Sequence, residues 1–184
     1  MKLTAVVASL LLCCLAVGAQ KSNDAIKQQI KSLKADKSIT LTYDGSSSKL
    51  MASATNFSDS DAKAANILAA NFGMAFFYPG QTLTTSPETI NLTFWVMSKK
   101  PRFASSGLWE ATLPSGPLSL GEYRYAAKPE NNMEYLNYKI SRSDLAKIAA
   151  SPLPVKFRLG AVTWSFTPEQ MQLLRNFIAL SDTK

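Results

Sequence analysis

The residues best suited to nucleophilic catalysis in this chain are a serine and a lysine three positions apart. Ser60 and Lys63 match the Ser-x-x-Lys spacing, in which a helix places the amine one turn beyond the hydroxyl, where it can take the proton. Ser46 and Lys49 share the spacing, but only the first pair lies in a segment expected to be helical. Neither Ser-Asp-Asn nor Lys-Thr-Gly occurs to complete such a site. A helix start followed by a solvated lysine is the alternative, since four-residue motifs recur by chance.

Three glutamates lie in segments that we expect to be strands: Glu110, Glu122 and Glu134. Two carboxyl groups that flank a glycosidic bond can hydrolyse it without histidine. Glu122 falls on the same expected strand face as Leu118 and Leu120, and an apolar surrounding is one way to prepare a carboxyl group as an acid. The alternative is that each glutamate lies at an exposed strand end or pairs with a neighbouring Arg or Lys.

Tyrosines are interleaved with basic residues between positions 123 and 139. The residues are Tyr123, Arg124, Tyr125, Lys128, Tyr135, Tyr138 and Lys139. Rings among cations suit single-stranded nucleic acid. Cross-strand aromatic packing is the ordinary explanation, and an exported protein does not meet that partner. We therefore expect no nucleic-acid partner.

The segment 20–37 is polar and rich in lysine, with a narrow apolar stripe at helical spacing. Lys27, Lys31, Lys34 and Lys37 are candidates for contact with an anionic surface, such as lipid head groups or an acidic polysaccharide. The alternative is a solvated leader that is partly helical or disordered.

Composition excludes several chemistries. The 184 residues include no histidine, and 20 basic residues against 13 acidic ones give a net charge of +7. Histidine therefore cannot serve here as a general base, as a metal ligand or as a pH switch. Cys13 and Cys14 are the two cysteines, and both lie in a segment that we expect to be removed. The mature chain would then have no thiol nucleophile, disulfide or cysteine zinc site, and we expect neither a metal nor another cofactor.

Residues 1–19 have the pattern of a secretory signal peptide. Lys2 precedes an apolar stretch over 4–17, and small residues before Gln20 predict cleavage between Ala19 and Gln20. The apolar run is shorter than the roughly 20 residues of a membrane-spanning helix. Lipidation of a cysteine in this segment is the alternative, although no small residue precedes either one. We expect an exported protein, periplasmic or secreted, of 165 residues after removal of 19 from 184.

Hydrophobic periodicity predicts many short strands and three helices. We expect strands at 39–43, 50–54, 74–78, 90–97, 108–113, 118–126, 133–140, 155–159 and 162–166. We expect helices from Ser58 or Asp59 to Leu68, after Ser141 or Ser143, and after Thr167, where Pro168 and Gln170 complete a capping box. The strand at 90–97 has Trp95 and Met97 on its second face, which favours cover on both faces.

The segment Ser141–Leu180 combines a short capped helix, a strand–Gly–strand hairpin over Val155–Phe166 and a final helix. With the strands at Ile39–Gly45 and Ile90–Phe94, this order of elements resembles that of uncharacterised exported bacterial α+β proteins. The resemblance implies an α+β domain closed by its last helix. It implies no activity, cofactor or site residue.

The predicted fold class is α+β, with an antiparallel β-sheet or sandwich of about seven to nine strands and a C-terminal helix packed on it. Residues 38–184 should form a single domain behind the leader. The predicted core residues are Ile39, Leu41, Leu92, Phe94, Leu136, Ile140, Phe157, Val162, Trp164, Phe166, Leu174 and Phe177.

The leading functional hypothesis is an exported non-enzymatic domain that binds an envelope protein or a small ligand at the cell envelope. No transmembrane segment is expected after processing. The alternatives are a histidine-free hydrolase that uses carboxylates or the Ser/Lys pair, and a structural component of the envelope. Asn56 and Asn91 lie in Asn-x-Ser/Thr sequons, which accept glycans only in a eukaryotic secretory pathway.

Overall fold

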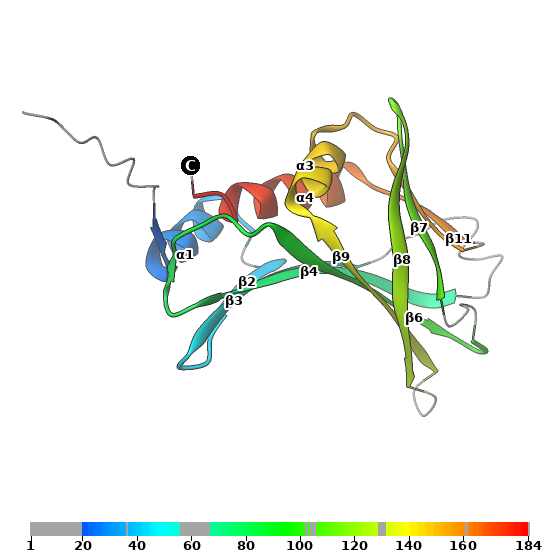
Figure 1. The fold of residues 1–184 in the computed structure, drawn as a ribbon, viewed down its shortest axis with the longest axis horizontal. Helices are drawn as coiled ribbons and strands as arrows, with labels where there is room; N and C mark the ends of the chain where they lie inside the picture. The colour runs from blue at the N-terminus through cyan, green and yellow to red at the C-terminus, as the bar shows by residue number, and fades with distance from the viewer. Residues whose placement is uncertain are drawn as a thin grey trace, which may run out of the picture.

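A nine-stranded antiparallel sheet forms the centre of the computed structural model (Figure 1). The structure describes residues 20–35, 37–55, 67–101, 103, 106–128, 132–160 and 162–183. In spatial order the strands are β11 (Val162–Ser165), β10 (Lys156–Leu159), β7 (Ser106–Leu113), β8 (Gly116–Lys128), β9 (Met133–Ser141), β6 (Thr89–Ser98), β4 (Ile67–Pro79), β3 (Ser47–Thr55) and β2 (Ile39–Tyr43). A two-stranded ribbon of β1 (Lys21–Ser22) and β5 (Thr82–Leu83) lies apart from this sheet.

The described helices lie on one side of the sheet (Figure 1). They are α1 (Asn23–Ser32), α3 (Arg142–Ala150) and α4 (Pro168–Leu180). The predicted α+β class and the antiparallel sheet are confirmed. The sheet is strongly curved in Figure 1, with β7 and β8 standing across the direction of β3 and β4.

The hairpin of β2 and β3 forms where the alternation of the sequence predicts it. Leu41 pairs with Leu50 in register, and the turn between the strands is closed by the carboxylate of Asp44. This carboxylate accepts hydrogen bonds from the backbone N–H groups of Ser47 at 2.8 Å and Ser46 at 2.9 Å. These bonds favour the ionised form and hold the pKa of Asp44 well below its usual range.

Strand β4 begins earlier than the sequence predicts. The expected helix would end at Leu68, but Ile67 and Leu68 already belong to β4. The earlier part of that expected helix, residues 58–66, lies outside the described residues. Strand β4 pairs with β3 on one side and β6 on the other, and these two ladders outweigh the helix propensity of its alanines.

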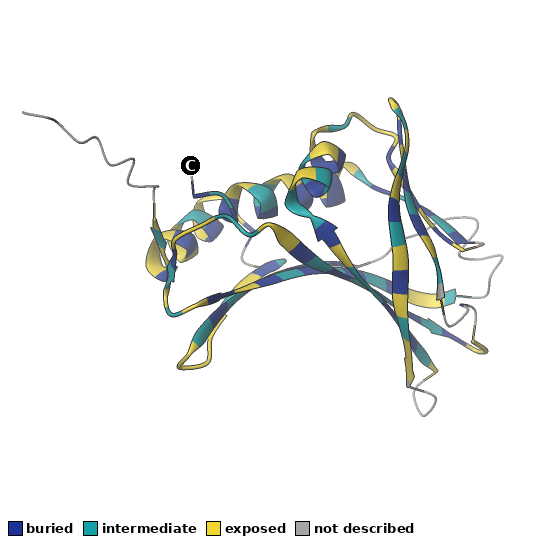
Figure 2. Cartoon of the chain, viewed as in Figure 1, coloured by how far each residue is buried: buried dark blue, intermediate teal, exposed yellow. Residues whose placement is uncertain are grey.

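The core is an aromatic layer between the sheet and the helices, seen as dark blue in Figure 2. Phe94 contacts Phe72 and Trp164, with ring centroids 4.9 Å and 5.1 Å apart. Phe157 packs edge-on against Phe166 at 4.6 Å. All predicted core residues are buried except Leu41, which is partly buried against the same cluster.

Both later helices begin at the predicted caps. The hydroxyl of Ser141 accepts a hydrogen bond from the backbone N–H of Asp144 at 3.0 Å and opens α3. Thr167 and Gln170 form the predicted capping box, with hydrogen bonds of 2.9 Å and 3.3 Å, and open α4. Helix α4 packs on the sheet through Phe177, whose ring lies 5.8 Å from that of Phe76 on β4.

The lysine-rich segment is joined to the main core by helix α1. Ile26 and Ile30 are buried in the same apolar cluster as the sheet. The side chain of Asn23 is also buried, where its amide donates to the Ser48 hydroxyl at 2.8 Å and its oxygen accepts from the Tyr78 hydroxyl at 2.5 Å. Helix α1 therefore packs into the same core as the sheet.

The first prediction concerns the docking of α4. Replacing the fully buried Phe177 with Ala should lower the free energy of unfolding by about 3–5 kcal/mol. The variant loses the free energy of burying the ring, and the cavity that the ring leaves adds a further cost. Denaturant unfolding of Phe177→Ala measures the loss. The exposed Gln172→Ala on the same helix is the control. A loss under about 1 kcal/mol for Phe177→Ala would show that α4 does not dock as described.

The second prediction concerns the attachment of α1. Tyr78→Phe removes the hydroxyl that donates to the buried oxygen of Asn23, so the free energy of unfolding should fall by about 1–3 kcal/mol. The control is Tyr43→Phe, which removes an exposed hydroxyl bonded to the Gly45 carbonyl. Equal losses in the two variants would contradict the assigned role of the buried bond.

Candidate ligand-binding site on the open face of the sheet

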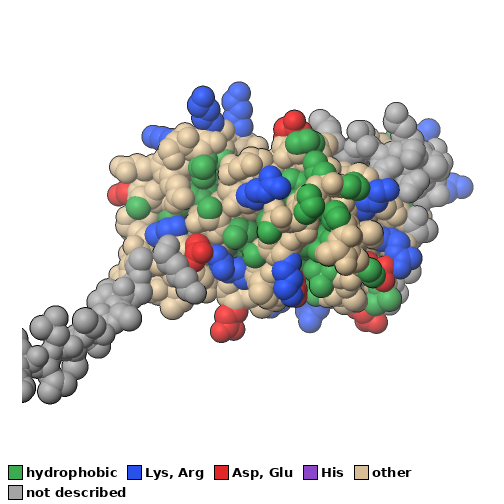
Figure 3. Space-filling view, turned by 90° about the horizontal axis from the view of Figure 1, so that it is seen from above, with side chains coloured by type: hydrophobic (Ala, Val, Ile, Leu, Met, Phe, Trp, Pro, Cys, Tyr) green, Lys and Arg blue, Asp and Glu red, His purple; other side chains and the backbone are tan. Residues whose placement is uncertain are grey.

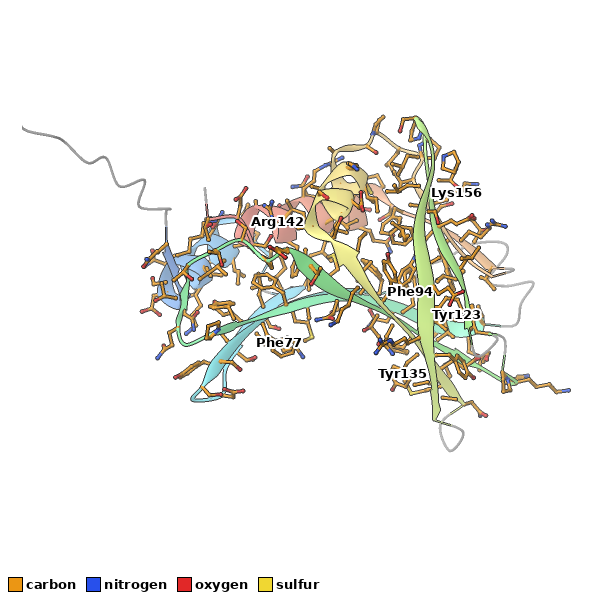
Figure 4. The ribbon with its side chains drawn as sticks, in the orientation of Figure 1. Phe77, Phe94, Tyr123, Tyr135, Arg142 and Lys156 are labelled. Carbon is orange, nitrogen blue, oxygen red and sulfur yellow. The ribbon has the colours of Figure 1, made fainter. Side chains whose placement is uncertain are left out.

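The face of the sheet that points away from the helices, here called the open face, carries the candidate site. In Figure 4, Phe77 and Tyr135 lie on this side, whereas Phe94 lies between the sheet and the helices. No helix in the described part of the chain covers the open face (Figure 1).

Strand β6 shows the two faces most clearly. Its alternate residues are buried toward the helices, and those between them are half-buried on the open face, including Trp95 and Met97. The prediction that this strand is covered on both faces is wrong for the described residues. The apolar signal of Trp95 and Met97 instead marks a partly exposed surface.

Two hollows on the open face join into one groove. Their volumes are about 520 Å³ and 370 Å³. Both are lined by Lys49, Ala75, Asn91 and Thr93, so they are continuous with each other. The groove crosses the strands and does not run along them.

The register of the sheet explains the direction of the groove. Ser53, Gly73, Thr93, Asn137 and Arg124 stand opposite one another on β3, β4, β6, β9 and β8. Neighbouring strands are about 4.8 Å apart, so this row of five residues is about 19 Å long. Small and polar residues occupy most of it, and a cation stands at its β8 end.

A second row runs parallel to the first, two residues along each strand. Met51, Ala75, Asn91 and Lys139 stand opposite one another on β3, β4, β6 and β9. Like the first row, it has a small residue on β4 and a cation at its far end, and its residue on β6 is an amide. The two rows together form the floor of the groove.

Larger side chains flank the floor on both sides. Trp95 and Tyr135 are cross-strand partners on one side, in the row that also contains Asn71. Lys49 and Phe77 are partners on the other side, with the Lys49 amine 5.5 Å from the centre of the Phe77 ring. Side-chain size thus falls at Gly73 and Ala75 and rises again at Phe77 along β4, and on β6 it falls beyond Trp95. This profile makes the hollow.

Position 73 is occupied by glycine, although the backbone conformation there does not require one. An added Cβ would meet only the carbonyl oxygens of Ala52 and Thr93, both at 3.8 Å, which is ordinary contact. Pairing continues without a break through Gly73 on both sides of β4, so no bulge explains it. Glycine inside a strand weakens the strand and often marks close approach by a ligand.

The amide side chains of the groove have unused hydrogen-bonding capacity. The side-chain oxygen of Asn71 is buried and has no donor in the structure. Thr93 donates to the Asn137 oxygen at 2.9 Å, which leaves the Asn137 amide group facing the groove. Unsatisfied buried polar atoms are rare in proteins, and the Asn71 residue lines the groove. Its oxygen is closed to solvent, so the amide must rotate before a ligand in the groove can supply the missing donor.

Three cations line the groove: Lys49, Arg124 and Lys139. None of them forms an ion pair with a carboxylate of the described residues. Glu122 is the one acidic residue that lines either hollow. The groove therefore has an excess of positive charge for which the described fold provides no partner.

The structure does not describe the Ser60 and Lys63 pair, which lies outside the described residues together with Asn56 and the predicted signal peptide that ends at Ala19. The second pair with this spacing is not helical. Ser46 is in the turn before β3, where its hydroxyl bonds to Asp44 at 2.9 Å, and Lys49 lies on β3.

The three candidate glutamates are not brought together. Glu110 pairs with Arg158 across β7 and β10, with the Arg158 Nε 2.6 Å from the Glu110 carboxylate. Glu122 is exposed on the open face. Glu134 is buried on the helix side of the sheet, where the backbone N–H of Phe103 donates to it at 3.0 Å.

The expectation that Glu122 shares a face with Leu118 and Leu120 is wrong. The pairing of β7 with β8 shifts at Trp109, so Leu120 is an extra residue on β8. Beyond this bulge the alternation inverts, and Glu122 points to the open face while Leu120 is buried.

The tyrosines of the aromatic and basic stretch are divided between the two faces. Tyr123 is buried on the helix side, and Tyr138 packs on the Trp109 ring at 5.6 Å. Burial, followed by the nearby Glu134 carboxylate, raises the pKa of Tyr125, whose hydroxyl bonds to Glu134 at 3.2 Å. Only Tyr135 of the four lies on the open face, so they form no continuous stacking surface.

Lys27, Lys31, Lys34 and Lys37 are all exposed, on or just after α1. None of the four lines the groove, but Lys37 lines a separate hollow together with Ser53, the β3 residue of the first row. Figure 3 looks onto the helix-covered side and shows Lys and Arg side chains spread over it. The predicted contact of these lysines with an anionic surface stays a prediction.

The chain matches no protein-family model, and comparisons with curated proteins and with solved structures find no significant similarity. Among the described residues, none of the helices is long and apolar enough to span a membrane.

Sequence reasoning missed the residues at the centre of the groove: Asn71, Gly73, Ala75, Asn91 and Asn137. One signal was present, since a strand face that mixes amides with tryptophan is neither a core face nor an ordinary solvated face. The register that aligns five strands was not readable from the sequence.

The third prediction tests whether the fold requires Gly73. Gly73→Ala should raise the free energy of unfolding by about 0.4–1 kcal/mol, because a compatible residue reduces the entropy of the unfolded chain. The control is Gly121→Ala, which should destabilise because Gly121 has a φ of +104° and a Cβ there is strained. Thermal or denaturant unfolding measures both. A clear loss of stability in Gly73→Ala would mean that the glycine is structural.

Proposed function

We propose that this chain is an exported non-enzymatic domain that binds an anionic ligand at the cell envelope, in the groove of the open face. The observation that carries the proposal is the set of three cations, Lys49, Arg124 and Lys139, around an amide-lined hollow without a described carboxylate partner. A concave site with a few convergent polar groups is the usual form of a ligand site.

The positions of the cations suit an elongated ligand. Arg124 and Lys139 stand on β8 and β9 at one end of the two rows, and Lys49 stands on β3 near the other end. An anion at about 4 Å from one such charge gains about 1 kcal/mol in water and up to about 4 kcal/mol near a protein surface. Negative charges distributed along a ligand would use both ends.

Binding is favoured over hydrolysis by the placement of the carboxyl groups. Glycoside hydrolysis by this chain needs two carboxyl groups on either side of one bond. Glu122 is the one carboxyl group that lines the described groove, Glu110 is held by Arg158, and Glu134 lies on the opposite face of the sheet.

Export rests on the N-terminal sequence, where Lys2, the apolar stretch and small residues before Gln20 have the order of a signal peptide. Without residues 1–19 the chain has 19 basic and 13 acidic residues, a net charge of +6. A basic domain outside the cytosol would meet the anionic polymers of the envelope, and its charge would speed their association with it.

The fourth prediction tests the groove cations. The triple variant Lys49→Gln, Arg124→Gln, Lys139→Gln should bind the soluble polyanions polygalacturonate and polyglutamate about 10- to 100-fold more weakly than the wild type, by calorimetric titration at low salt. Wild-type affinity should fall as salt increases, because exposed charges are screened.

The matched control removes three charges from the other side of the molecule. Lys27→Gln, Lys31→Gln, Lys34→Gln should leave the affinity nearly unchanged, since these exposed side chains lie on or just after α1. Equal losses in both triple variants would mean that net charge alone attracts the polyanion. A loss confined to the α1 variant would move the site to the lysine-rich helix.

A further inference from the structure

We infer that the ligand of the groove is an acidic saccharide, with a sugar ring over Gly73 beside Trp95 and its carboxylates at the cations. The inference rests on the proposed function and adds the chemical class of the ligand. Three features of the groove carry it: the clearance above the floor, the free amide groups, and the positions of the charges.

The clearance above the floor suits a ring. Gly73 and Ala75 lie on the central strand β4. Gly73 has no side chain, although a Cβ would fit there without a clash, so the space above it is open. Trp95 stands on the next strand, one row away, and lines the same hollow. A ring over Gly73 could therefore contact the backbone of β4 from above and the indole from the side. Tryptophan provides a large rigid apolar surface at low entropic cost.

The free amides suit hydroxyl groups. The buried oxygen of Asn71 lacks a donor. Once the amide rotates toward the groove, a hydroxyl supplies that donor, whereas a carboxylate or phosphate cannot. The Asn91 side chain forms no hydrogen bond with a described residue and lines both hollows. An amide both donates and accepts, so it can bind two neighbouring hydroxyls of one sugar. A polyanion without hydroxyls would leave this capacity unused.

The charges suit carboxylates spaced along a chain. Arg124 presents a planar fork that binds a carboxylate through two hydrogen bonds, and Lys139 stands beside it across β8 and β9. Lys49 lies at the β3 side of the floor. The row between β3 and β8 is about 19 Å long, which gives room for a short oligosaccharide with more than one acidic sugar.

The test compares polyanions with and without sugar rings. Polygalacturonate and alginate should bind at least about tenfold more tightly than polyglutamate of equal charge, measured by calorimetry at one salt concentration. Gly73→Leu, which fills the hollow, and Trp95→Leu, which removes the indole, should each weaken saccharide binding about tenfold and leave polyglutamate binding nearly unchanged. Methyl esterification of polygalacturonate should also abolish tight binding, because it removes the carboxylates.

The control is Met97→Leu, on the open face one row beyond Trp95 and outside the residues that line the groove. It should bind both polymers like the wild type. Circular dichroism and unfolding midpoints of Gly73→Leu and Trp95→Leu establish that each variant is folded, and the two variants alter different walls of the hollow.

The outcomes separate the ligand class from the proposed function. Equal binding of polyglutamate and the saccharides, or wild-type saccharide binding by folded Gly73→Leu and Trp95→Leu, would overturn the saccharide class and leave an anion-binding groove. Saccharide binding that survives loss of the three groove cations would overturn the proposed groove function. No saturable binding of any polyanion would overturn both.

Discussion

The rest of the structure depends on the burial of one face of the sheet beneath the helices. Phe72, Phe94 and Trp164 interlock there, and helix α4 adds Phe177. Successive side chains in a strand point to opposite faces, so a slip of one residue would expose these rings and bury polar neighbours such as Asn71. The aromatic layer therefore specifies the register of the central strands.

The same register determines the composition of the open face. Once Phe72 and Phe94 are directed toward the helices, Gly73 and Thr93 must stand side by side on the other face. The groove is thus a second result of the packing that stabilises the core. Its floor lies on strands that are hydrogen-bonded on both sides, and such a rigid scaffold limits the ordering cost of binding a ligand.

The two sides of the molecule divide its positive charge into unlike sets. The lysines on or just after α1 are exposed, and their long side chains are flexible, which is typical of a solvated helix surface. The cations of the groove are combined with amides, an indole and a hollow. Charge alone attracts any polyanion, whereas the groove combines charge with shape and hydrogen bonding, the combination from which specificity arises.

Local signals in the sequence predicted much of the fold. The capping box at Thr167, the cap at Ser141 and the alternation over 39–43 each depend on residues a few positions apart, and all three elements form as predicted. The start of β4 was predicted wrongly because pairing with two neighbouring strands overrides alanine propensity. The face of Glu122 was predicted wrongly because one bulged residue, Leu120, inverts the alternation beyond it.

By itself, the sequence determined that no histidine takes part in any chemistry of the chain, since it has none. It also determined the helix starts after Ser141 and Thr167 and the strand at 39–43, because these depend on neighbours along the chain. The tertiary structure alone decided that Ser53, Gly73, Thr93, Asn137 and Arg124 form one row. Those residues come from five different strands. Their alignment depends on long-range pairing, and the register of that pairing is set by the side chains on the other face of the sheet, which pack in the core.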